Sequence, residues 1–340
     1  MNKQSFTYNL TKDKTSLQSV VINEPTVILS NEFGDKYLNY RQTWMDAARK
    51  NLKLSFPIHL DIEICDACNL DCKFCLEKQR GWSKERFSSH LLKKILHEAN
   101  NFDHFSSINL SYNAEALYDK NHFVEIIKLF DFFERPFDIF VHTNGVNLDQ
   151  SITHEILNSK ITNLCVSVDT FKKSTYEILR SGNFEKLTEN IKYLYKQKAI
   201  LNIDFPIVRL SCIVNEFNHD ERDDIISYWK QYADIIEFQN LALPFETAQK
   251  NPKYYRSSFK CNDPWKRLTI QSNGDVYPCC AFSIFNRNLL LGNIIDRTIY
   301  EIWNGQKLND LRKEISSGKY TKFSTCKDCQ NSQYKYKVEK

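Results

Sequence analysis

Four of the chain's 11 cysteines fall in one short stretch, from Cys65 to Cys75. Three of them, Cys68, Cys72 and Cys75, have the spacing C-x3-C-x2-C. A loop this short can bring three thiolates to one metal centre, and soft sulfur ligands select iron–sulfur clusters or zinc. Three ligands leave one iron of a four-iron cubane without a protein ligand. The spacing therefore predicts an iron–sulfur cluster with one open site, where the chemistry would begin.

The motif resembles that of the radical SAM superfamily, with Asn69-Leu70 after its first cysteine and an aromatic residue, Phe74, before its last. The resemblance implies that S-adenosylmethionine binds the open iron through its amino and carboxylate groups. One electron then cleaves it to methionine and a 5′-deoxyadenosyl radical, which takes a hydrogen atom from a small-molecule or peptide substrate. An external electron donor such as flavodoxin or ferredoxin is also implied.

A zinc knuckle is the alternative for this stretch. Cys65-x2-Cys68 and Cys72-x2-Cys75 form two C-x2-C pairs. Only three residues separate the pairs, whereas zinc folds of that type usually need a longer intervening loop. The iron–sulfur interpretation is therefore favoured.

Length and charge limit what such a chain can be. Its 340 residues suffice for a barrel and a smaller module, and a net charge of +4 does not demand a nucleic-acid partner, which we do not expect. No apolar run approaches the roughly 20 residues that span a bilayer, and Met1 to Asn9 contains no secretory signal. Clustered cysteines in an unexported chain predict metal ligands in a reducing cytoplasm, without membrane contact.

Strand-like and helix-like segments alternate from Pro57 onward, which predicts an α/β fold with a parallel sheet. The strand-like segments are residues 59–64, 107–112, 138–142, 163–168, 208–214 and 235–243. The resemblance implies a partial (β/α)6 barrel with the cysteine loop after its first strand. In such barrels the functional groups lie at the C-terminal ends of strands.

Three regions follow from this reading of the chain. We expect an N-terminal extension over residues 1–56, a barrel over 57–245 and a cysteine-rich module over 246–340. Aromatic residues in the extension show no clear periodicity, and Val20 to Leu29 would form a short strand or two. We expect the extension to pack on the barrel as a cap, with a substrate or partner contact as the alternative.

The family usually has Gly-Gly-Glu after its second strand, where its carboxylate holds the ammonium group of S-adenosylmethionine. This chain has Asn113-Ala114-Glu115 there. The resemblance therefore assigns all three residues to cofactor binding and gives the ammonium contact to Glu115. The alternative for Glu115 is a carboxylate at a helix N-terminus near Leu117.

Two residues at the end of the fourth strand, Ser167 and Asp169, share one face of that strand. The family places ribose-binding groups here, although Asp169 could instead cap a helix that starts near Lys172. Arg180 resembles a family position near the methionine carboxylate, with a surface arginine as the alternative.

Asn144 and Asn215 follow the third and fifth strands and would touch the cofactor or close a turn. The ring of Phe74 would pack under the adenine or in the core. Cys165 and Cys212 lie within strands and are predicted to be buried apolar residues rather than ligands.

A second cysteine group follows the barrel: Cys261, Cys279, Cys280, Cys326 and Cys329. Asn273-Gly274 joins two strand-like segments and predicts a hairpin that returns Cys279 beside Cys261. Four thiolates suit one closed site, for which we assign Cys261, Cys279, Cys326 and Cys329. Zinc is the alternative metal, because four thiolates also suit zinc.

The spacing C-x12-G-x4-C with a later C-x2-C resembles the SPASM/twitch extension of radical SAM enzymes. The SPASM form with two clusters needs seven or more cysteines, so five imply one auxiliary [4Fe–4S] cluster, as in the twitch form. Cys280 is left over, as a bystander or alternative ligand. It would instead be catalytic if its thiol donated a hydrogen atom to a substrate radical, which would make the enzyme an epimerase.

The resemblance covers about residues 57–335 and implies a radical SAM enzyme of the oxidoreductase type. The single-cluster module resembles that of dehydrogenases acting on aminocyclitols. We therefore expect oxidation of a hydroxyl-bearing carbon on a sugar-like small molecule, in which the auxiliary cluster accepts the second electron or binds the substrate. The alternatives are modification of a ribosomally made peptide, tRNA modification, and a zinc-binding interaction protein without catalysis.

Overall fold

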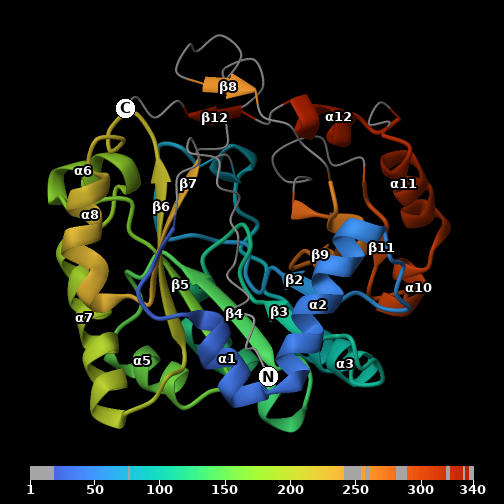
Figure 1. Ribbon diagram of the computed structural model, residues 1–340, viewed down its shortest axis with the longest axis horizontal. Coiled ribbons are helices and arrows are strands. Elements are labelled where there is room, and N and C mark those ends of the chain that lie inside the picture. The colour runs from blue at the N-terminus through green and yellow to red at the C-terminus, as the bar shows by residue number, and fades with distance from the viewer. Residues whose placement is uncertain are drawn as a thin grey trace, which may run out of the picture.

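The computed structural model describes residues 19–75, 77–240, 254–256, 261–280, 289–318, 322–331 and 334–336. Its centre is a ten-stranded sheet with the order β1-β7-β6-β5-β4-β3-β2-β9-β10-β11 (Figure 1). The strands β2 to β7 are parallel neighbours in chain order, which confirms the predicted parallel sheet. They are β2 (His59–Ile62), β3 (Ser107–Asn109), β4 (Asp138–Thr143), β5 (Asn163–Ser167), β6 (Ile207–Val214) and β7 (Ile235–Asn240).

Helices connect successive strands and cover one face of the sheet. Figure 1 shows α5, α7 and α8 side by side along the outer face of the green and yellow strands. The connecting helices are η1 (Glu77–Arg80), α3 (Ser89–Ala99), η2 (Ala116–Tyr118), α4 (Lys120–Lys128), η3 (Leu129–Phe132), α5 (Gln150–Leu157), α6 (Lys173–Arg180), α7 (Phe184–Leu201), α8 (Arg222–Trp229) and η4 (Lys230–Tyr232).

Side-chain alternation gives the two faces of the sheet opposite character. On β4, Ile139 and Val141 are buried in the apolar core, while Asp138, Phe140 and His142 take the other face because successive side chains point to opposite sides. The apolar face packs on the helices. The opposite face, called the inner face below, is therefore left for polar groups.

The N-terminal region differs from the sequence-based expectation. Only Val20–Val21 forms a strand, β1, which pairs antiparallel with β7. The prediction of strands as far as Leu29 is wrong, because Glu24 caps a helix whose first residue is Pro25, a favourable residue at that position.

Two helices follow β1 and reach the inner face. They are α1 (Pro25–Phe33) and α2 (Asp35–Lys50). On α2, the Tyr40 hydroxyl donates to Ser107 Oγ at 3.1 Å, and the Trp44 ring meets that of His59 edge-on at 5.9 Å between centroids. Because Ser107 and His59 begin their strands, α2 covers the N-terminal end of the inner face.

The C-terminal region continues the same sheet. β9 (Arg267–Ile270) pairs in parallel with β2 and forms the predicted hairpin with β10 (Asp275–Tyr277), beyond which lies β11 (Gly292–Asn293). Gly274 sits in the hairpin turn with φ +87°, a conformation that favours glycine. The expected boundary between residues 245 and 246 lies outside the described residues, so the three-region division stays a prediction.

The C-terminal helices dock against the barrel through specific hydrogen bonds. Glu98 on α3 accepts from the backbone N–H groups of Ile299 and Tyr300, at 3.0 and 2.7 Å. Trp303 Nε1 donates to the carbonyl of Leu54 at 2.8 Å. The remaining elements are β8 (Tyr254–Arg256), which pairs with β12 (Tyr334–Tyr336), η5 (Asp263–Trp265), α10 (Ile299–Trp303), α11 (Gln306–Ser316) and α12 (Ser324–Asn331).

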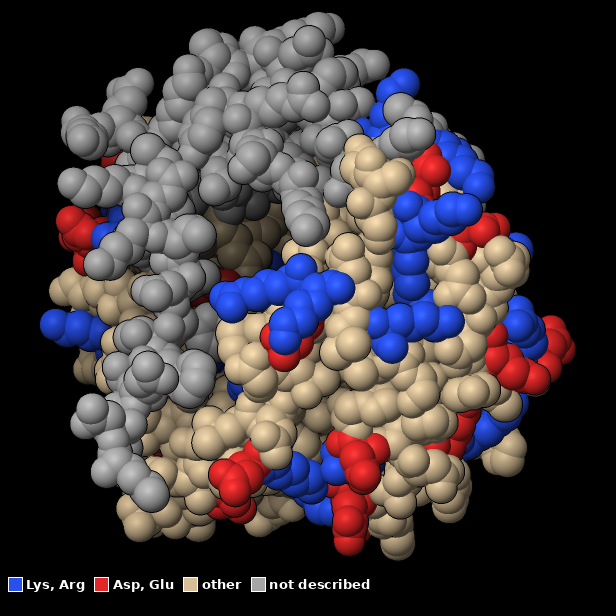
Figure 2. Space-filling model, turned by 45° about the vertical axis from the view of Figure 1, so that its right-hand side comes forward, with Lys and Arg blue, Asp and Glu red and all other residues tan. Residues whose placement is uncertain are grey.

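The described helices include none with the length and apolar character needed to cross a membrane. Figure 2 shows acidic side chains lying among the lysines and arginines on the described part of one face.

Candidate functional site

The loop after β2 holds the first cysteine group against the end of α6. Lys73 N–H donates to the carbonyl of Leu179 at 3.0 Å, and the Cys72 thiol lies 3.9 Å from the carbonyl of Arg180. The Ser181 hydroxyl donates to the carbonyl of Asp71 at 3.3 Å. These contacts fix the loop where its three half-buried thiols, those of Cys68, Cys72 and Cys75, lie together.

Two N–H groups approach the sulfur of Cys68, those of Leu70 at 3.5 Å and of the Asn144 side chain at 3.9 Å. The Asn144 amide also donates to Asn69 Oδ1 at 2.8 Å, which connects the end of β4 to the cysteine loop. N–H donors directed at a ligand sulfur stabilise its thiolate and tune the potential of an iron–sulfur cluster.

Burial raises the pKa of Cys68 to about 12 and also raises that of Cys72. The nearby thiols contribute in the same direction, as expected for three sulfurs that approach one another. Such thiols lose their protons when metal binds. In the described part of the chain, no three His, Cys, Asp or Glu side chains surround the position of one metal ion. In a cubane, each thiolate binds a different iron, so a loop of three thiols fits a four-iron cluster.

Glu115 is a buried carboxylate beside this loop, 2% exposed. Its oxygens accept from Leu117 N–H at 2.9 Å, Thr143 Oγ1 at 2.6 Å and Asn144 N–H at 2.6 Å. Burial raises its pKa, and no described lysine or arginine donates to it. A buried carboxylate with only neutral donors suits a cationic ligand, so the ammonium of S-adenosylmethionine fits here. The alternative prediction, a carboxylate at a helix N-terminus near Leu117, is also confirmed, because the Glu115 side chain caps η2.

Asp169 and Arg180 form a buried ion pair, with 2.5 Å between Asp169 Oδ2 and Arg180 Nε. The other oxygen of Asp169 accepts from Ile213 N–H at 2.8 Å. The surface alternative for Arg180 is therefore wrong, and so is the helix cap for Asp169, because α6 has no side-chain cap. The guanidinium lies 5.4 Å from the centroid of the half-buried Phe74 ring.

The other predicted cofactor residues surround the same edge of the sheet. Ser167 is half-buried and ends β5, whereas Asn215 closes the turn after β6 by accepting from Phe217 N–H at 2.9 Å. Asn113 and Ala114 are half-buried, and the Ala114 carbonyl accepts from Ser111. Their contacts with S-adenosylmethionine stay predictions.

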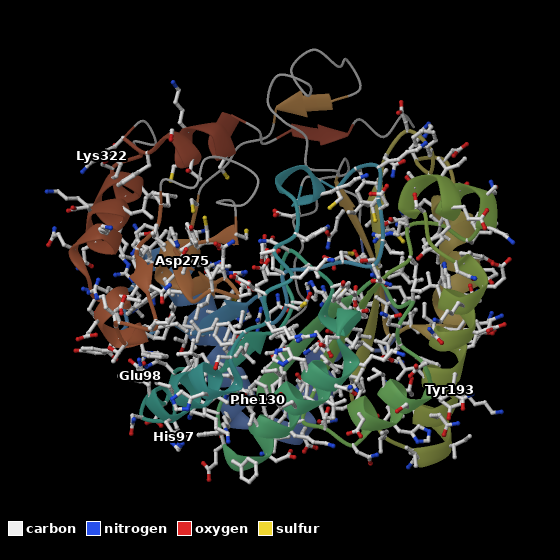
Figure 3. All side chains as sticks on the ribbon, turned by 180° about the vertical axis from the view of Figure 1, so that it is seen from behind. His97, Glu98, Phe130, Tyr193, Asp275 and Lys322 are labelled. Atoms are coloured by element: carbon white, nitrogen blue, oxygen red, sulfur yellow. The ribbon has the colours of Figure 1, made fainter. Side chains whose placement is uncertain are left out.

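In the C-terminal group, Cys326 and Cys329 act electrostatically on Cys261, which places the three thiols close together. Burial raises the pKa of Cys261 strongly and that of Cys326 to about 11. Cys279 follows β10, at the hairpin end where Cys261 precedes η5. Figure 3 shows sulfur atoms beside α12 and the C-terminal hairpin, apart from those near the loop after β2.

Cys280 has a different environment from its neighbour. The Tyr112 hydroxyl hydrogen-bonds its thiol, and Arg267 and Asp61 act on it electrostatically. Burial raises its pKa to about 11. Cys280 therefore faces side chains of the inner face.

The polar side chains of the inner face were not singled out from the sequence. Asp61 Oδ1 lies 3.1 Å from His59 Nε2. The Asp61 carboxylate also accepts from the Asn109 side chain at 3.1 Å and from Arg267 at 3.2 Å. The second ring nitrogen of His59 lies 2.7 Å from Ser107 Oγ. Alternation of polar and apolar residues along each strand indicates a polar face, but it does not distinguish a face inside the protein from one in solvent.

Across the inner face, Arg209 Nη1 donates to Glu237 Oε2 at 2.9 Å, with the side chains 34% and 25% exposed. His142 is exposed, yet burial and the charge of Arg209 lower its pKa to about 4. The ring makes no hydrogen bond with the described residues.

Two family models match the chain. The model described as the radical SAM superfamily matches residues 62–228, and the model described as SPASM, an iron–sulfur cluster-binding domain, matches residues 261–330. Both matches favour iron–sulfur clusters over zinc at the two cysteine groups.

Two curated relatives differ in activity. The S-adenosyl-L-methionine-dependent 2-deoxy-scyllo-inosamine dehydrogenase of Niallia circulans is 21% identical over 280 residues, covering 80% of this chain and 92% of that protein. A GTP 3′,8-cyclase of Lactiplantibacillus plantarum is 24% identical over 227 residues, covering 64% of this chain and 66% of that protein.

Solved structures share the fold at low identity. BtrN in complex with AdoMet and 2-DOIA has a TM-score of 0.55 and 16% identity, covering 82% of this chain and 94% of that one. Streptococcus suis SuiB bound to precursor peptide SuiA has a TM-score of 0.59 and 17% identity, covering 87% of this chain and 74% of that one. The structure of anSMEcpe with bound AdoMet and Cp18Cys peptide has a TM-score of 0.60 and 17% identity, covering 83% of this chain and 93% of that one.

The parallel sheet, the three-cysteine loop at its C-terminal edge and the cysteine-rich hairpin region agree with both family models. The chain belongs to the radical SAM superfamily and has a C-terminal SPASM iron–sulfur cluster region.

Proposed function

We propose that this protein oxidises a hydroxyl-bearing carbon of a polar, sugar-like small molecule to a ketone. The observation that most supports this proposal is the inner face, whose strands present charged and hydrogen-bonding side chains next to the predicted cofactor site. Buried polar groups favour a ligand that can satisfy them. A molecule with several hydroxyl or amino groups can hydrogen-bond the partly exposed side chains of Arg209 and Glu237, whereas an apolar molecule would bury their charges without offering them a partner.

The reacting groups meet at one edge of the sheet. When bound, the cluster of the three-cysteine loop and S-adenosylmethionine supply the radical that removes a hydrogen atom. Glu115 would hold the cofactor's ammonium, and Arg180, fixed by Asp169, would hold its carboxylate. Arg209 and Glu237, half-accessible on the inner face, offer a donor and an acceptor to neighbouring substrate hydroxyls.

One auxiliary [4Fe–4S] cluster completes the proposal, bound by the thiolates of Cys261, Cys279, Cys326 and Cys329. It would accept the second electron of the oxidation. An external flavodoxin or ferredoxin would reduce the first cluster, and the two clusters suit a reducing cytoplasm. The name of the Niallia circulans relative, a dehydrogenase of 2-deoxy-scyllo-inosamine, supports this reaction class.

A substrate panel tests the proposal. Anaerobically reconstituted, reduced protein with S-adenosylmethionine would be incubated separately with 2-deoxy-scyllo-inosamine, myo-inositol and glucosamine. We expect a ketone from at least one of them, with about one 5′-deoxyadenosine per ketone, measured by mass spectrometry. Formation of 5′-deoxyadenosine with no ketone from any of the three would contradict the proposed oxidation.

Epimerisation is the second candidate. The observation that favours it is Cys280, whose thiol hydrogen-bonds Tyr112 and lies near Arg267, and which would return a hydrogen atom to a substrate radical. Peptide substrates belong to this alternative, since solved structures with the same fold hold a precursor peptide and a Cp18Cys peptide. Incorporation of one solvent deuterium into recovered substrate, lost in Cys280→Ala, would favour epimerisation over oxidation.

A further inference from the structure

Oxidation of an alcohol by this route requires a group that takes the hydroxyl proton. The substrate carbon loses a hydrogen atom, the hydroxyl loses a proton, and one electron leaves, so that the C–O single bond becomes C=O. In the proposed function, the 5′-deoxyadenosyl radical receives the hydrogen atom and the auxiliary iron–sulfur cluster receives the electron. The proton must go to a base of the protein on the inner face.

Most basic groups of the inner face are already engaged. Asp61 is paired with Arg267 and hydrogen-bonded to Asn109 and His59. Both ring nitrogens of His59 have partners, and Glu237 is paired with Arg209. A carboxylate paired with a guanidinium is a weak base, because the cation stabilises its ionised form.

His142 is the exception among these groups. It lies on β4 opposite Cys165 of β5, on the face shared by Phe140. Its ring is exposed, and neither nitrogen makes a hydrogen bond with the described residues. The next residues along the chain, Thr143 and Asn144, both donate to Glu115. The C-terminal end of β4 therefore reaches the predicted S-adenosylmethionine site one residue beyond His142, whose side chain lies on the inner face.

We propose that His142 is the catalytic base that accepts the proton of the substrate hydroxyl as the neighbouring carbon is oxidised. The proposal rests on the proposed function. The charged or titratable groups that act electrostatically on the ring are Arg209 of β6, Glu237 of β7, and Asp61 and His59 of β2. Burial and the charge of Arg209 outweigh the opposing carboxylates of Asp61 and Glu237, so the lowered pKa of His142 leaves the ring unprotonated at neutral pH, the form that a base requires.

The test compares His142→Gln with wild type, both with clusters loaded and with the polyol that wild type oxidises. Glutamine retains polarity but cannot take a proton. We expect ketone formation to fall at least about 100-fold, the usual scale for a lost general base. The substrate radical should persist, so freeze-quenched samples should show an organic radical by electron paramagnetic resonance that wild type does not accumulate.

Two further variants make the result specific. His142→Ala should regain ketone formation on addition of imidazole, with a rate that follows the unprotonated fraction of the added imidazole. His154→Gln is the matched control, because His154 is an exposed histidine on α5 that lies 2.8 Å from the hydroxyl of Tyr193, labelled in Figure 3. It should leave both measurements unchanged.

The possible results separate the two proposals. If His142→Gln forms the ketone at the same rate as wild type and accumulates no radical, the assignment of His142 is overturned and the oxidation still stands. Absence of ketone with wild type would overturn the proposed oxidation, and the assignment of His142 with it.

Discussion

The Asp169–Arg180 ion pair yields the sharpest prediction about stability. Its side chains are 0% and 8% exposed, and 2.5 Å separates their nearest polar atoms. Arg180→Met removes the guanidinium and leaves the Asp169 carboxylate charged without a partner. Breaking one side of a buried pair costs about 3–5 kcal/mol, so we expect the free energy of unfolding to fall by that amount.

The double variant Asp169→Asn with Arg180→Met isolates the charge. Asparagine tolerates the positive φ of +57° at this position and can still accept from Ile213 N–H. Because no buried charge remains, the double variant should be more stable than Arg180→Met alone by about 2 kcal/mol. A matched surface control is Arg222→Met, whose pair with Asp223 is exposed and should change stability by less than about 1 kcal/mol.

Urea unfolding of the anaerobic proteins, followed by circular dichroism, measures these differences. The pair also lies against the cysteine loop through Phe74, so Arg180→Met should weaken S-adenosylmethionine binding in calorimetric titration. An Arg180→Met protein within 1 kcal/mol of wild type, or a double variant less stable than that single one, would refute the reasoning.

Three further predictions concern other parts of the molecule. Burial raises the pKa of Asp138 from 3.8 to about 6. The protonated carboxyl therefore contributes to stability below pH 3.8, and this contribution is lost as the pH rises through 6. Asp138→Asn should increase the free energy of unfolding by up to about 3 kcal/mol at pH 8 but hardly at pH 4, measured by urea titration at both pH values. Gly145→Ala should lower stability by about 3 kcal/mol in the same assay, because φ is +76° and the added carbon would lie 2.5 Å from Leu187 Cδ1; an unchanged midpoint would contradict this. Cys279→Ala should reduce iron from about eight toward about four atoms per chain, whereas Cys280→Ala should keep it, by iron analysis of reconstituted protein; equal loss in both variants would make Cys280 a ligand.

Local sequence signals predicted the parallel sheet and the three-cysteine loop. Both depend on short-range patterns, namely strand alternation and the spacing of Cys68, Cys72 and Cys75. The hairpin at Gly274 belongs to the same class, because a two-residue turn fixes its own geometry. The N-terminal helices were missed because only a few residues of α2, such as Tyr37 and Tyr40, are buried, which leaves a weak periodic signal.

The inner face could not be identified from local pattern. A polar residue that alternates with apolar ones, such as His142 on β4, is equally expected on a solvent-facing strand. Only long-range contacts, namely the packing of α2 against the starts of β2 and β3 and the pairing of β9 with β2, show that this face is covered. Likewise, Arg180 and Asp169 are 11 residues apart in sequence, and nothing local shows that the end of α6 returns to β5.

Reductive cleavage of S-adenosylmethionine tests the central claim most directly. Wild-type protein, reconstituted anaerobically with intact clusters and reduced with dithionite, should form 5′-deoxyadenosine and methionine, and a variant with Cys68, Cys72 and Cys75 all replaced by alanine should form neither. Wild-type protein that shows the spectrum of a reduced four-iron cluster but leaves S-adenosylmethionine intact would contradict the account.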